Sequence, residues 1–281
     1  APLITLPPSA TAPVTELALN QIERLAAEDC EVIVLGPTSE VSDAVFNAVK
    51  AKVANTRRLS SASGDAETLA KALYEEGADK WNTSGTFILA TSNDAADALS
   101  ISPYAYASKT PIFFTDAEGA LNDEVKTLLT SGAFKRVVIA GGTGVVSQET
   151  EDTLNAAGIA SVRLFGAHRF YTSIAIAKWV LGQDSEAAFQ PDVLLTLDKM
   201  GVATGMDYAD ALASVDVLGR TGGLLLLVAD HNSTLKKLFE DTVAELITPN
   251  KKSMTAGYIF GGKGVVSEGV EATLNAAVAE D

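Results

Sequence analysis

Short apolar runs of strand length alternate with amphipathic stretches along the whole chain. The runs that end at Thr91 and Thr115, and the run at 223–229, are almost continuously apolar. The segment 121–129 instead places apolar residues at positions 121, 125, 128 and 129, which share one face of a helix. Strands that alternate with helices over short links predict an α/β fold with mostly parallel sheets.

Two further elements complete the expected order within one unit. We expect a strand at 163–165 and a helix at 172–181. Glycines stand where helices should end, at positions 77, 132, 158 and 182.

One strand-to-turn motif occurs three times, so the chain is a tandem repeat. Its copies lie at 32–42, 137–147 and 258–267, spaced by 105 and 120 residues. The second and third copies share the sequence Gly-Gly-x-Gly-Val-Val-Ser. We therefore divide the chain into a truncated first copy (1–55), a second copy (56–160) and a third copy (161–281), with 2–6 aligned to the strand at 111–115.

A second motif repeats between 88–99 and 201–212 without gaps. Both segments carry a strand that ends in Ala-Thr, followed by a helix that contains Ala-Asp-Ala-Leu. Seven positions are identical: Ala90/Ala203, Thr91/Thr204, Asp94/Asp207, Ala96/Ala209, Asp97/Asp210, Ala98/Ala211 and Leu99/Leu212. Because each polar motif follows a strand, we expect these motifs to gather at the carboxyl ends of the sheets, where α/β folds bind ligands.

The chain is strongly acidic, with 36 acidic against 21 basic residues and a net charge of −15. This balance argues against nucleic-acid binding through the overall field. No apolar stretch reaches about 18 residues, so membrane insertion is not expected. The amino terminus lacks the features of a signal peptide, and we expect either a removed signal or a segment of a longer chain. The basic pairs at segment edges are interpreted mostly as solvated faces, and they are also the positive spots that a polyanion would have to use; they are Arg57-Arg58, Lys135-Arg136, Lys236-Lys237 and Lys251-Lys252.

Cysteine and histidine are too scarce for a metal cluster or a disulfide framework. Cys30 is the one cysteine and is expected as a buried thiol beside a strand. His168 and His231 lie in different stretches of the chain, which argues against a histidine zinc site. We expect no metal centre and no cofactor, with a bridging divalent cation left open.

The glycine turn invites comparison with a dinucleotide site. That fingerprint needs G-x-G-x-x-G and an acidic residue about 20 positions later. Gly141, Gly142 and Gly144 have a different spacing, and the first copy replaces its second glycine with Pro37. A tight turn from strand to helix is therefore favoured for Gly141-Gly142 and Gly261-Gly262. A weak anion contact at the helix start stays an alternative.

Charged residues beside the repeated turns are the other candidates. Asp97 and Asp210 stand in apolar company, and could cap backbone N–H groups, pair with a basic residue, or contact a ligand or cation. Arg169 follows a strand and could bind an anionic or sugar ligand, or brace one copy against the next by pairing with such an aspartate.

A serine closes each copy of the turn. Ser42, Ser147 and Ser267 stand where helix N-caps belong, and acidic residues follow them. A nucleophilic serine would need a nearby base, and no histidine repeats with these three. Capping is the favoured interpretation.

The ordered motifs together resemble the type 2 cell wall binding repeat. They are Ala-Thr-x-x-x-x-Ala-Asp-Ala-Leu, an apolar strand, Gly-Gly-x-Gly-Val-Val-Ser and then Arg-Leu-x-Gly-x-x-Arg-Phe-x-Thr. The resemblance covers 84–182 and 192–276 most fully and 1–55 more weakly. His168 stands where the family usually has Asp or Asn, and the Arg-aromatic motif is absent after Arg58.

The resemblance implies three Rossmann- or Toprim-like α/β repeats around a pseudo-threefold axis. It also implies a non-enzymatic module that anchors a secreted protein to the surface of a Gram-positive cell by binding an anionic, teichoic-acid-like wall polymer. An effector domain elsewhere in a longer chain would be its cargo. Carried over by position, the candidate polymer-binding residues are Thr91, Asp97, Gly141, Gly142, Arg169, Thr204, Asp210, Gly261 and Gly262.

Two other classes of function stay open from the sequence. One is an enzyme that uses a nucleotide or phospho-sugar at the glycine turns. The other is a structural segment of a surface layer or adhesin.

Overall fold

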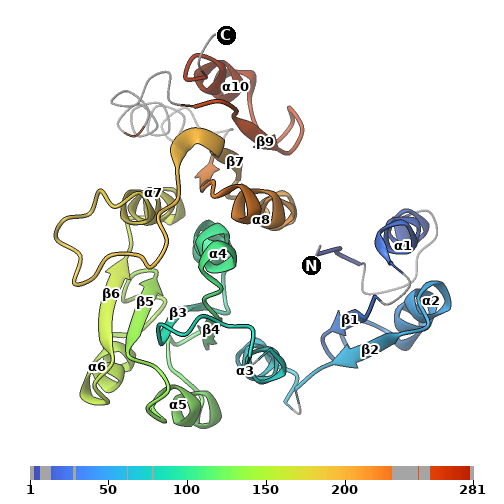
Figure 1. The fold of residues 1–281 in the computed structure, drawn as a ribbon, viewed down its shortest axis with the longest axis horizontal. Helices are drawn as coiled ribbons and strands as arrows, with labels where there is room; N and C mark the ends of the chain where they lie inside the picture. Colours follow the sequence, from blue (N-terminus) through green and yellow to red (C-terminus); the bar gives the residue numbers. More distant parts are fainter. Residues whose placement is uncertain are drawn as a thin grey trace. The chain divides into compact units, whose positions relative to one another are not determined.

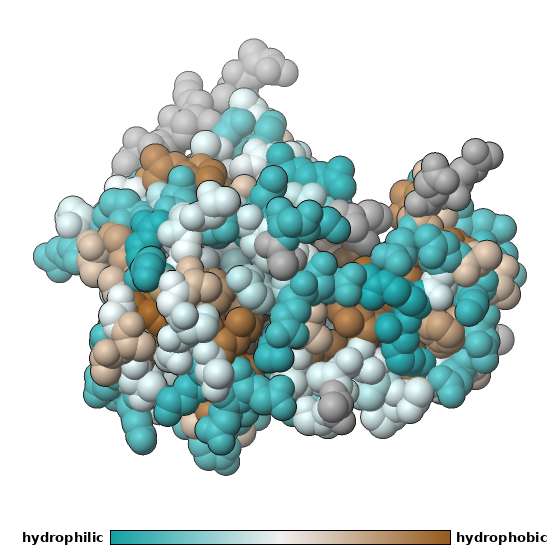
Figure 2. Space-filling model, turned by 60° about the horizontal axis from the view of Figure 1, so that its bottom comes forward, coloured by the Kyte–Doolittle hydropathy of each residue, from teal (hydrophilic) through white to brown (hydrophobic). Residues whose placement is uncertain are grey.

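A computed structural model describes residues 3–6, 14–27, 30–61, 63–77, 79–229, 246 and 254–278. The chain divides into two compact units, residues 1–78 and 79–281. The described part of the first unit contains one short parallel sheet and that of the second contains two, each with helices beside it, so the expected α/β fold is confirmed (Figure 1). His231, Lys236-Lys237 and Lys251-Lys252 lie outside the described residues. On the face drawn in Figure 2, hydrophilic residues cover much of the surface and hydrophobic ones form patches between them.

The first unit is built on a two-stranded parallel sheet. In chain order it has α1 (Val14–Leu25), β1 (Val32–Leu35), α2 (Asp43–Lys52), β2 (Thr56–Leu59) and α3 (Ala66–Glu76). Ile22, Val34 and Val49 form its buried centre, and Ile4 and Leu6 pack against them. The alignment of 2–6 with a strand is wrong for the described positions, because residues 3–6 form no ladder and contribute only their side chains.

The second copy of the repeat forms a four-stranded parallel sheet in the order β4-β3-β5-β6. Its elements are β3 (Thr86–Thr91), α4 (Ala96–Ser108), β4 (Ile112–Thr115), α5 (Asp123–Leu129), β5 (Arg136–Ala140), α6 (Gln148–Ala156), β6 (Ala160–Leu164) and α7 (Arg169–Val180). Every residue of β3 is buried, as expected for a strand covered on both faces.

The third copy forms a three-stranded parallel sheet in the order β8-β7-β9. It contains the 3-10 turn η1 (Leu197–Lys199), β7 (Gly201–Thr204), α8 (Ala209–Thr221), β8 (Leu225–Val228), β9 (Tyr258–Phe260) and α10 (Glu268–Asn275). The apolar run expected as a strand near 223–229 is β8, and it is buried throughout.

Helices α4 and α7 lie between these two sheets, while α5 and α6 lie on the outer side of the four-stranded sheet (Figure 1). The core is continuous across the layers, because Ile88 and Tyr104 of the second copy share one cluster with Val202 and Leu226 of the third. Gly219 lets α8 approach α4 closely, since a Cβ atom there would lie 2.6 Å from the Tyr106 side chain. The two copies therefore share one hydrophobic interior.

The predicted ends of several elements are close to the observed ones. Gly158 and Gly182 have positive φ angles of +81° and +69° directly after α6 and α7, as expected for glycines that end helices. The helix expected at 172–181 begins three residues earlier, at Arg169. Cys30 is half-buried where a buried thiol was expected, because it precedes β1 by two residues.

The division of the sequence into copies at residues 55 and 160 stays a prediction, as does the pseudo-threefold axis. Strands on either side of each division pair with each other. β1 pairs with β2, which begins at Thr56, and β5 pairs with β6, which begins at Ala160. The strand that follows each division, β2 or β6, therefore belongs to the sheet of the copy before the division.

Candidate functional site

Two loops at equivalent positions of the repeat follow β3 and β7, and the same hydrogen bonds shape both. Thr91 Oγ1 accepts a bond from the N–H of Asn93 at 3.1 Å, and Thr204 Oγ1 accepts one from the N–H of Met206 at 3.2 Å. Both threonines are buried. Their hydroxyls are therefore occupied in turning the chain from strand to helix.

An aspartate then leads each loop into its helix. Asp94 Oδ1 accepts a hydrogen bond from the N–H of Ala96 at 2.9 Å, and Asp207 Oδ1 accepts one from Ala209 at 2.8 Å. An acidic side chain at this place satisfies a free N–H group and lies at the positive end of the helix. The identity of positions 94 and 207 between the copies thus has a local structural cause.

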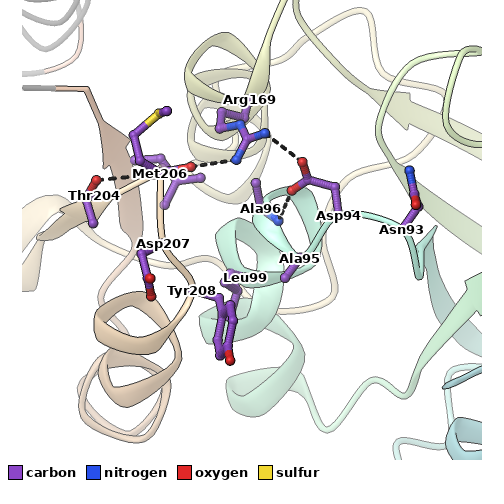
Figure 3. A pocket seen from close by; sticks show the side chains of 12 residues that line it. Asn93, Asp94, Ala95, Ala96, Leu99, Arg169, Thr204, Met206, Asp207 and Tyr208 are labelled. Atoms are coloured by element: carbon purple, nitrogen blue, oxygen red, sulfur yellow. Dashed lines mark hydrogen bonds and ion pairs between the residues drawn. The ribbon is translucent and has the colours of Figure 1, made fainter. Parts of the chain in front are cut away.

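The two loops line a single pocket (Figure 3). Its volume is about 340 Å³, which is at the small end of the range for ligand pockets. The residues that line it are Asn93, Asp94, Ala95, Ala96, Leu99, Arg169, Thr204, Gly205, Met206, Asp207, Tyr208 and Leu227. The second and third copies therefore build this pocket together, each with the loop at the start of its Ala-Asp-Ala-Leu helix.

Arg169 links the two loops across the pocket. Its Nη2 lies 2.6 Å from Asp94 Oδ2, and its Nη1 donates to the carbonyl of Gly205 at 2.6 Å (Figure 3). The bracing role expected as one alternative is therefore present. The expected partner is wrong, however: Arg169 pairs with Asp94 in the loop, and not with Asp97 on the helix, because α7 begins at Arg169 itself and holds this side chain beside the loops.

Asp97 packs against the first glycine of its own turn. Gly141 has a φ angle of +125°, and a Cβ atom there would lie 2.9 Å from Asp97 Oδ2 and 2.6 Å from Val145 Cγ2. The third copy repeats this contact, because a Cβ atom on Gly261, at a φ angle of +122°, would lie 2.8 Å from Asp210 Oδ2. The sequence motifs are thus brought together in two equivalent pairs, Asp97 with Gly141 and Asp210 with Gly261.

The pKa of the Asp97 carboxyl is raised to about 6. Burial is the main cause, and the nearby charge of Asp94 adds to it, while Arg169 and a hydrogen bond with Thr172 act in the opposite direction. A carboxylate in contact with the glycine turn disfavours a phosphate at the same place. This geometry argues against a phosphate cradle at Gly141-Gly142.

Two arginines close the turns of the first and second copies. Arg163 donates to the carbonyls of Gly141 at 3.0 Å and Val146 at 2.9 Å, and pairs with Glu151 at 2.8 Å. Arg58, which stands 105 residues earlier, donates to the carbonyl of Gly36 at 2.9 Å. The interpretation of Arg58 as part of a solvated face is wrong, because its side chain is largely covered and holds a turn. The repeat spacing alone pairs Arg58 with Arg163.

Each serine of the repeated motif caps a helix, as expected. Ser42 accepts a hydrogen bond from the N–H of Val45, Ser147 from Thr150 and Ser267 from Val270, at 3.3, 3.1 and 3.3 Å. The capping interpretation is confirmed in all three copies.

The nine residues expected to bind a polymer therefore occupy three kinds of place. Arg169 and Thr204 line the pocket, and Thr91 lies at the base of one of its loops. Asp97, Asp210, Gly141 and Gly261 form the two aspartate–glycine contacts. Gly142 and Gly262 lie on the outer part of the turn, where no positive φ angle or crowding requires glycine.

Sequence reasoning missed the residues that give the pocket its chemistry. Asp94 and Asp207 were visible as identical positions between the copies, but Met206 and Tyr208 replace Asn93 and Ala95 and therefore carried no repeat signal. Within the described parts of the chain, His, Cys, Asp and Glu side chains nowhere gather in threes as a metal site would need. No helix in those parts is long and apolar enough to cross a membrane.

Comparison with known proteins gives a consistent assignment. The sequence matches the family described as cell wall binding domain 2 (CWB2) over residues 49–151 and 163–271. It is 27% identical over 209 residues to the N-acetylmuramoyl-L-alanine amidase LytC of Bacillus subtilis (strain 168), a match that covers 74% of this chain and 36% of the amidase. The chain thus spans about a third of the length of that relative.

Two solved structures share the fold. Cwp8 from Clostridium difficile superposes with a TM-score of 0.65 at 21% identity, over 89% of this chain and 39% of that protein. Cwp6 from the same organism superposes with a TM-score of 0.61 at 19% identity, over 78% of this chain and 31% of that protein.

Proposed function

The chain belongs to the cell wall binding domain 2 family, and from this premise we propose that it is a non-catalytic module that binds an anionic, teichoic-acid-like polymer of the cell wall without a covalent bond. It would hold a secreted protein at the surface of a Gram-positive cell. The effector that it anchors would lie elsewhere in a longer chain.

One observation carries this proposal: the two segments that match the family each supply one wall of the same pocket. The first matching segment contributes 93–96 and Leu99, and the second contributes Arg169, 204–208 and Leu227. Ligands of α/β proteins bind beyond the carboxyl ends of the strands, and both loops follow such ends. The repeated motifs thus support a shared binding place between copies.

The candidate residues would act in two ways. We assign polymer contact to the pocket that Arg169 and Thr204 line. Asp97 with Gly141, and Asp210 with Gly261, would act indirectly by fixing the turns beside the loops. Thr91 would hold the second-copy loop in place.

Sedimentation with purified walls tests the proposal. The 281-residue chain should co-sediment with intact Gram-positive walls, and retention should fall after the phosphodiester-linked polymer has been extracted with hydrofluoric acid. Equal retention before and after extraction would refute polymer binding. A parallel sample with a chelator reports whether a divalent cation bridges the acidic protein and the polymer.

A matched pair of variants locates the binding. Arg169→Gln removes the link between the loops and should lower wall retention. Arg136→Gln removes a comparable ion pair with Asp192, of 2.6 Å, away from the pocket and should leave retention unchanged. Equal loss in both variants would point to general destabilisation and against a site at the pocket.

A further inference from the structure

The charges that line the pocket between the second and third copies do not suit an anionic group. Among the described residues, the side chains of the pocket that carry a formal charge at neutral pH are Asp94, Asp207 and Arg169. Arg169 is already engaged by Asp94 and by the carbonyl of Gly205, each at 2.6 Å. A phosphate would have to displace Asp94 from the guanidinium and then lie beside two carboxylates, which costs Coulomb energy.

The acidic side chains can instead accept hydrogen bonds from a ligand. Asp207 Oδ1 is used by the N–H of Ala209, and its other oxygen has no protein partner within the described residues. Ionised carboxylates accept and do not donate hydrogen bonds. The complementary ligand groups are therefore hydroxyls or an ammonium group.

The remaining surface of the pocket is apolar and partly aromatic. Ala96, Leu99 and Leu227 are buried in its floor. Met206 and Tyr208 on the third-copy loop are 71% and 62% exposed. An exposed aromatic ring beside a pocket offers a flat apolar contact face, while its hydroxyl can still bind water or ligand.

We propose that this pocket binds an uncharged or amino-bearing sugar residue of the wall polymer, and that it does not read the polymer's phosphate. The proposal rests on the function proposed above. A sugar ring offers an apolar face to Tyr208 and hydroxyl donors to Asp207 and Asp94. The asymmetry of the loops sets its orientation, because Tyr208 and Met206 stand where the second copy has Ala95 and Asn93.

Calorimetric titration with two defined probes tests the ligand class. One probe is the neutral oligosaccharide that hydrofluoric acid releases from a phosphodiester-linked wall polymer, and the other is glycerol 3-phosphate. We expect saturable binding of the oligosaccharide and none of glycerol 3-phosphate. Saturable binding of glycerol 3-phosphate in place of the oligosaccharide would overturn the proposal.

Substitutions at the pocket separate stacking and hydrogen bonding from charge attraction. Tyr208→Ala should weaken oligosaccharide binding by about tenfold, as is common for a central aromatic contact, whereas Tyr208→Phe should keep most of it. Val217→Ala changes an exposed apolar residue of α8 that does not line the pocket; it is the control and should have no effect. Equal binding by Tyr208→Ala and wild type would refute the stacking contact.

Asp207→Asn should change the affinity in opposite directions for a pocket that binds a sugar and a pocket that binds phosphate. Asn still caps a helix well but is a weaker acceptor, so oligosaccharide binding should fall by about threefold to tenfold. If the pocket binds the phosphate group instead, the same change removes a repulsive charge and binding should strengthen.

The two proposals can also fail separately. Wild-type protein that sediments with intact walls but ignores the oligosaccharide refutes the sugar pocket alone, whereas protein that binds the oligosaccharide but not walls refutes the anchoring function alone.

Discussion

The glycine turns of the second and third copies have nearly the same backbone in different surroundings. Gly141 and Gly261 have φ angles of +125° and +122°, and each contacts the aspartate of its own copy. Gly141 is buried, and Arg163 holds its carbonyl. Gly261 is exposed.

This difference teaches that the turn is shaped locally. The first copy supports this conclusion, because Gly36 also has a positive φ angle, of +108°, and Arg58 donates to its carbonyl. The carboxylate nearest to a Cβ atom on Gly36 would be that of Glu40 in the same turn, at 3.4 Å. The features that all three copies share are the first glycine and the capping serine. The arginine and the aspartate therefore add stability to a turn that the glycine already permits.

The largest expected effect comes from breaking the turn itself. Gly141→Ala forces an L-residue into a positive φ angle and brings a methyl group against Val145 and Asp97. Backbone strain and crowding together should lower the free energy of unfolding by about 3–5 kcal/mol. Urea denaturation followed by circular dichroism measures the loss.

Gly142→Ala is the matched control for this change. A Cβ atom there would lie 3.6 Å from the Phe165 ring at an ordinary contact distance, so the loss should stay below about 1 kcal/mol. Similar losses for the two variants would contradict the assigned role of the first glycine. Hydrogen exchange of 136–156, with 256–275 as the internal reference, localises the damage to the second copy.

Removal of the arginine that donates to the turn carbonyls should have the next largest effect. Arg163→Met removes the positive charge beside Glu151, which keeps the hydrogen bond from Ser161, and leaves two turn carbonyls without this donor. The side chains of the ion pair are only 10% and 13% exposed. We expect a loss of about 3 kcal/mol. Arg58→Met should cost less, about 1 kcal/mol, because its partner Asp43 is mostly exposed. The same denaturation experiment ranks them, and a reversed order would contradict the comparison.

The pH dependence of stability should reveal Asp97. Its pKa in the folded protein is raised to about 6, whereas that of an unfolded aspartate is about 3.9. Between these values the folded state holds a proton that the unfolded state has lost, so the contribution of Asp97 to stability falls as pH rises through this window.

Asp97→Asn removes this titration. The stability of the variant relative to wild type should improve by on the order of 2 kcal/mol between pH 4 and pH 7. Denaturation midpoints of both proteins across that pH range give the difference in stability between them. The contributions of the other titrating groups are the same in both proteins and cancel. A difference that does not change with pH would show that the carboxyl is not perturbed by burial.

The smallest effect is expected at the caps. Ser147→Ala and Ser267→Ala each remove one hydrogen bond to a free N–H group, of 3.1 and 3.3 Å. Each should lower stability by about 1 kcal/mol. Similar shifts in melting temperature would show that the cap acts alike in a buried and in an exposed turn, whereas a loss confined to one copy would contradict local control of the turn.

The fold could be predicted from the sequence because its signals are local. Buried strands are continuous apolar runs, as in β3 and β8, and serine caps and helix-ending glycines depend on a few neighbouring residues. The first unit was harder to predict, since 3–6 pack against the core by side chains without joining a sheet. A pattern of apolar residues does not tell these two outcomes apart.

The candidate site could be predicted only in part. The pairing of Asp97 with Gly141 follows from parallel neighbouring strands, β3 and β5, whose carboxyl ends share an edge. The pocket instead depends on how two copies pack through α4, α7 and α8, and this packing has no signature in either copy alone. A comparison of the repeats also identifies only the residues that the copies share, so it did not point to Tyr208 and Met206, which differ between the copies.

The pocket that two copies build together has a consequence for how such chains evolve. A site with one wall from each neighbour belongs to a junction, and so the number of sites in an array follows its junctions and not its copies. Duplication of one copy would create a further pocket between neighbours, and each wall could then change separately. The contrast between Ala95 and Tyr208 is a difference of this kind, and for a pocket that binds a ligand as proposed, such differences would change the ligand one junction at a time.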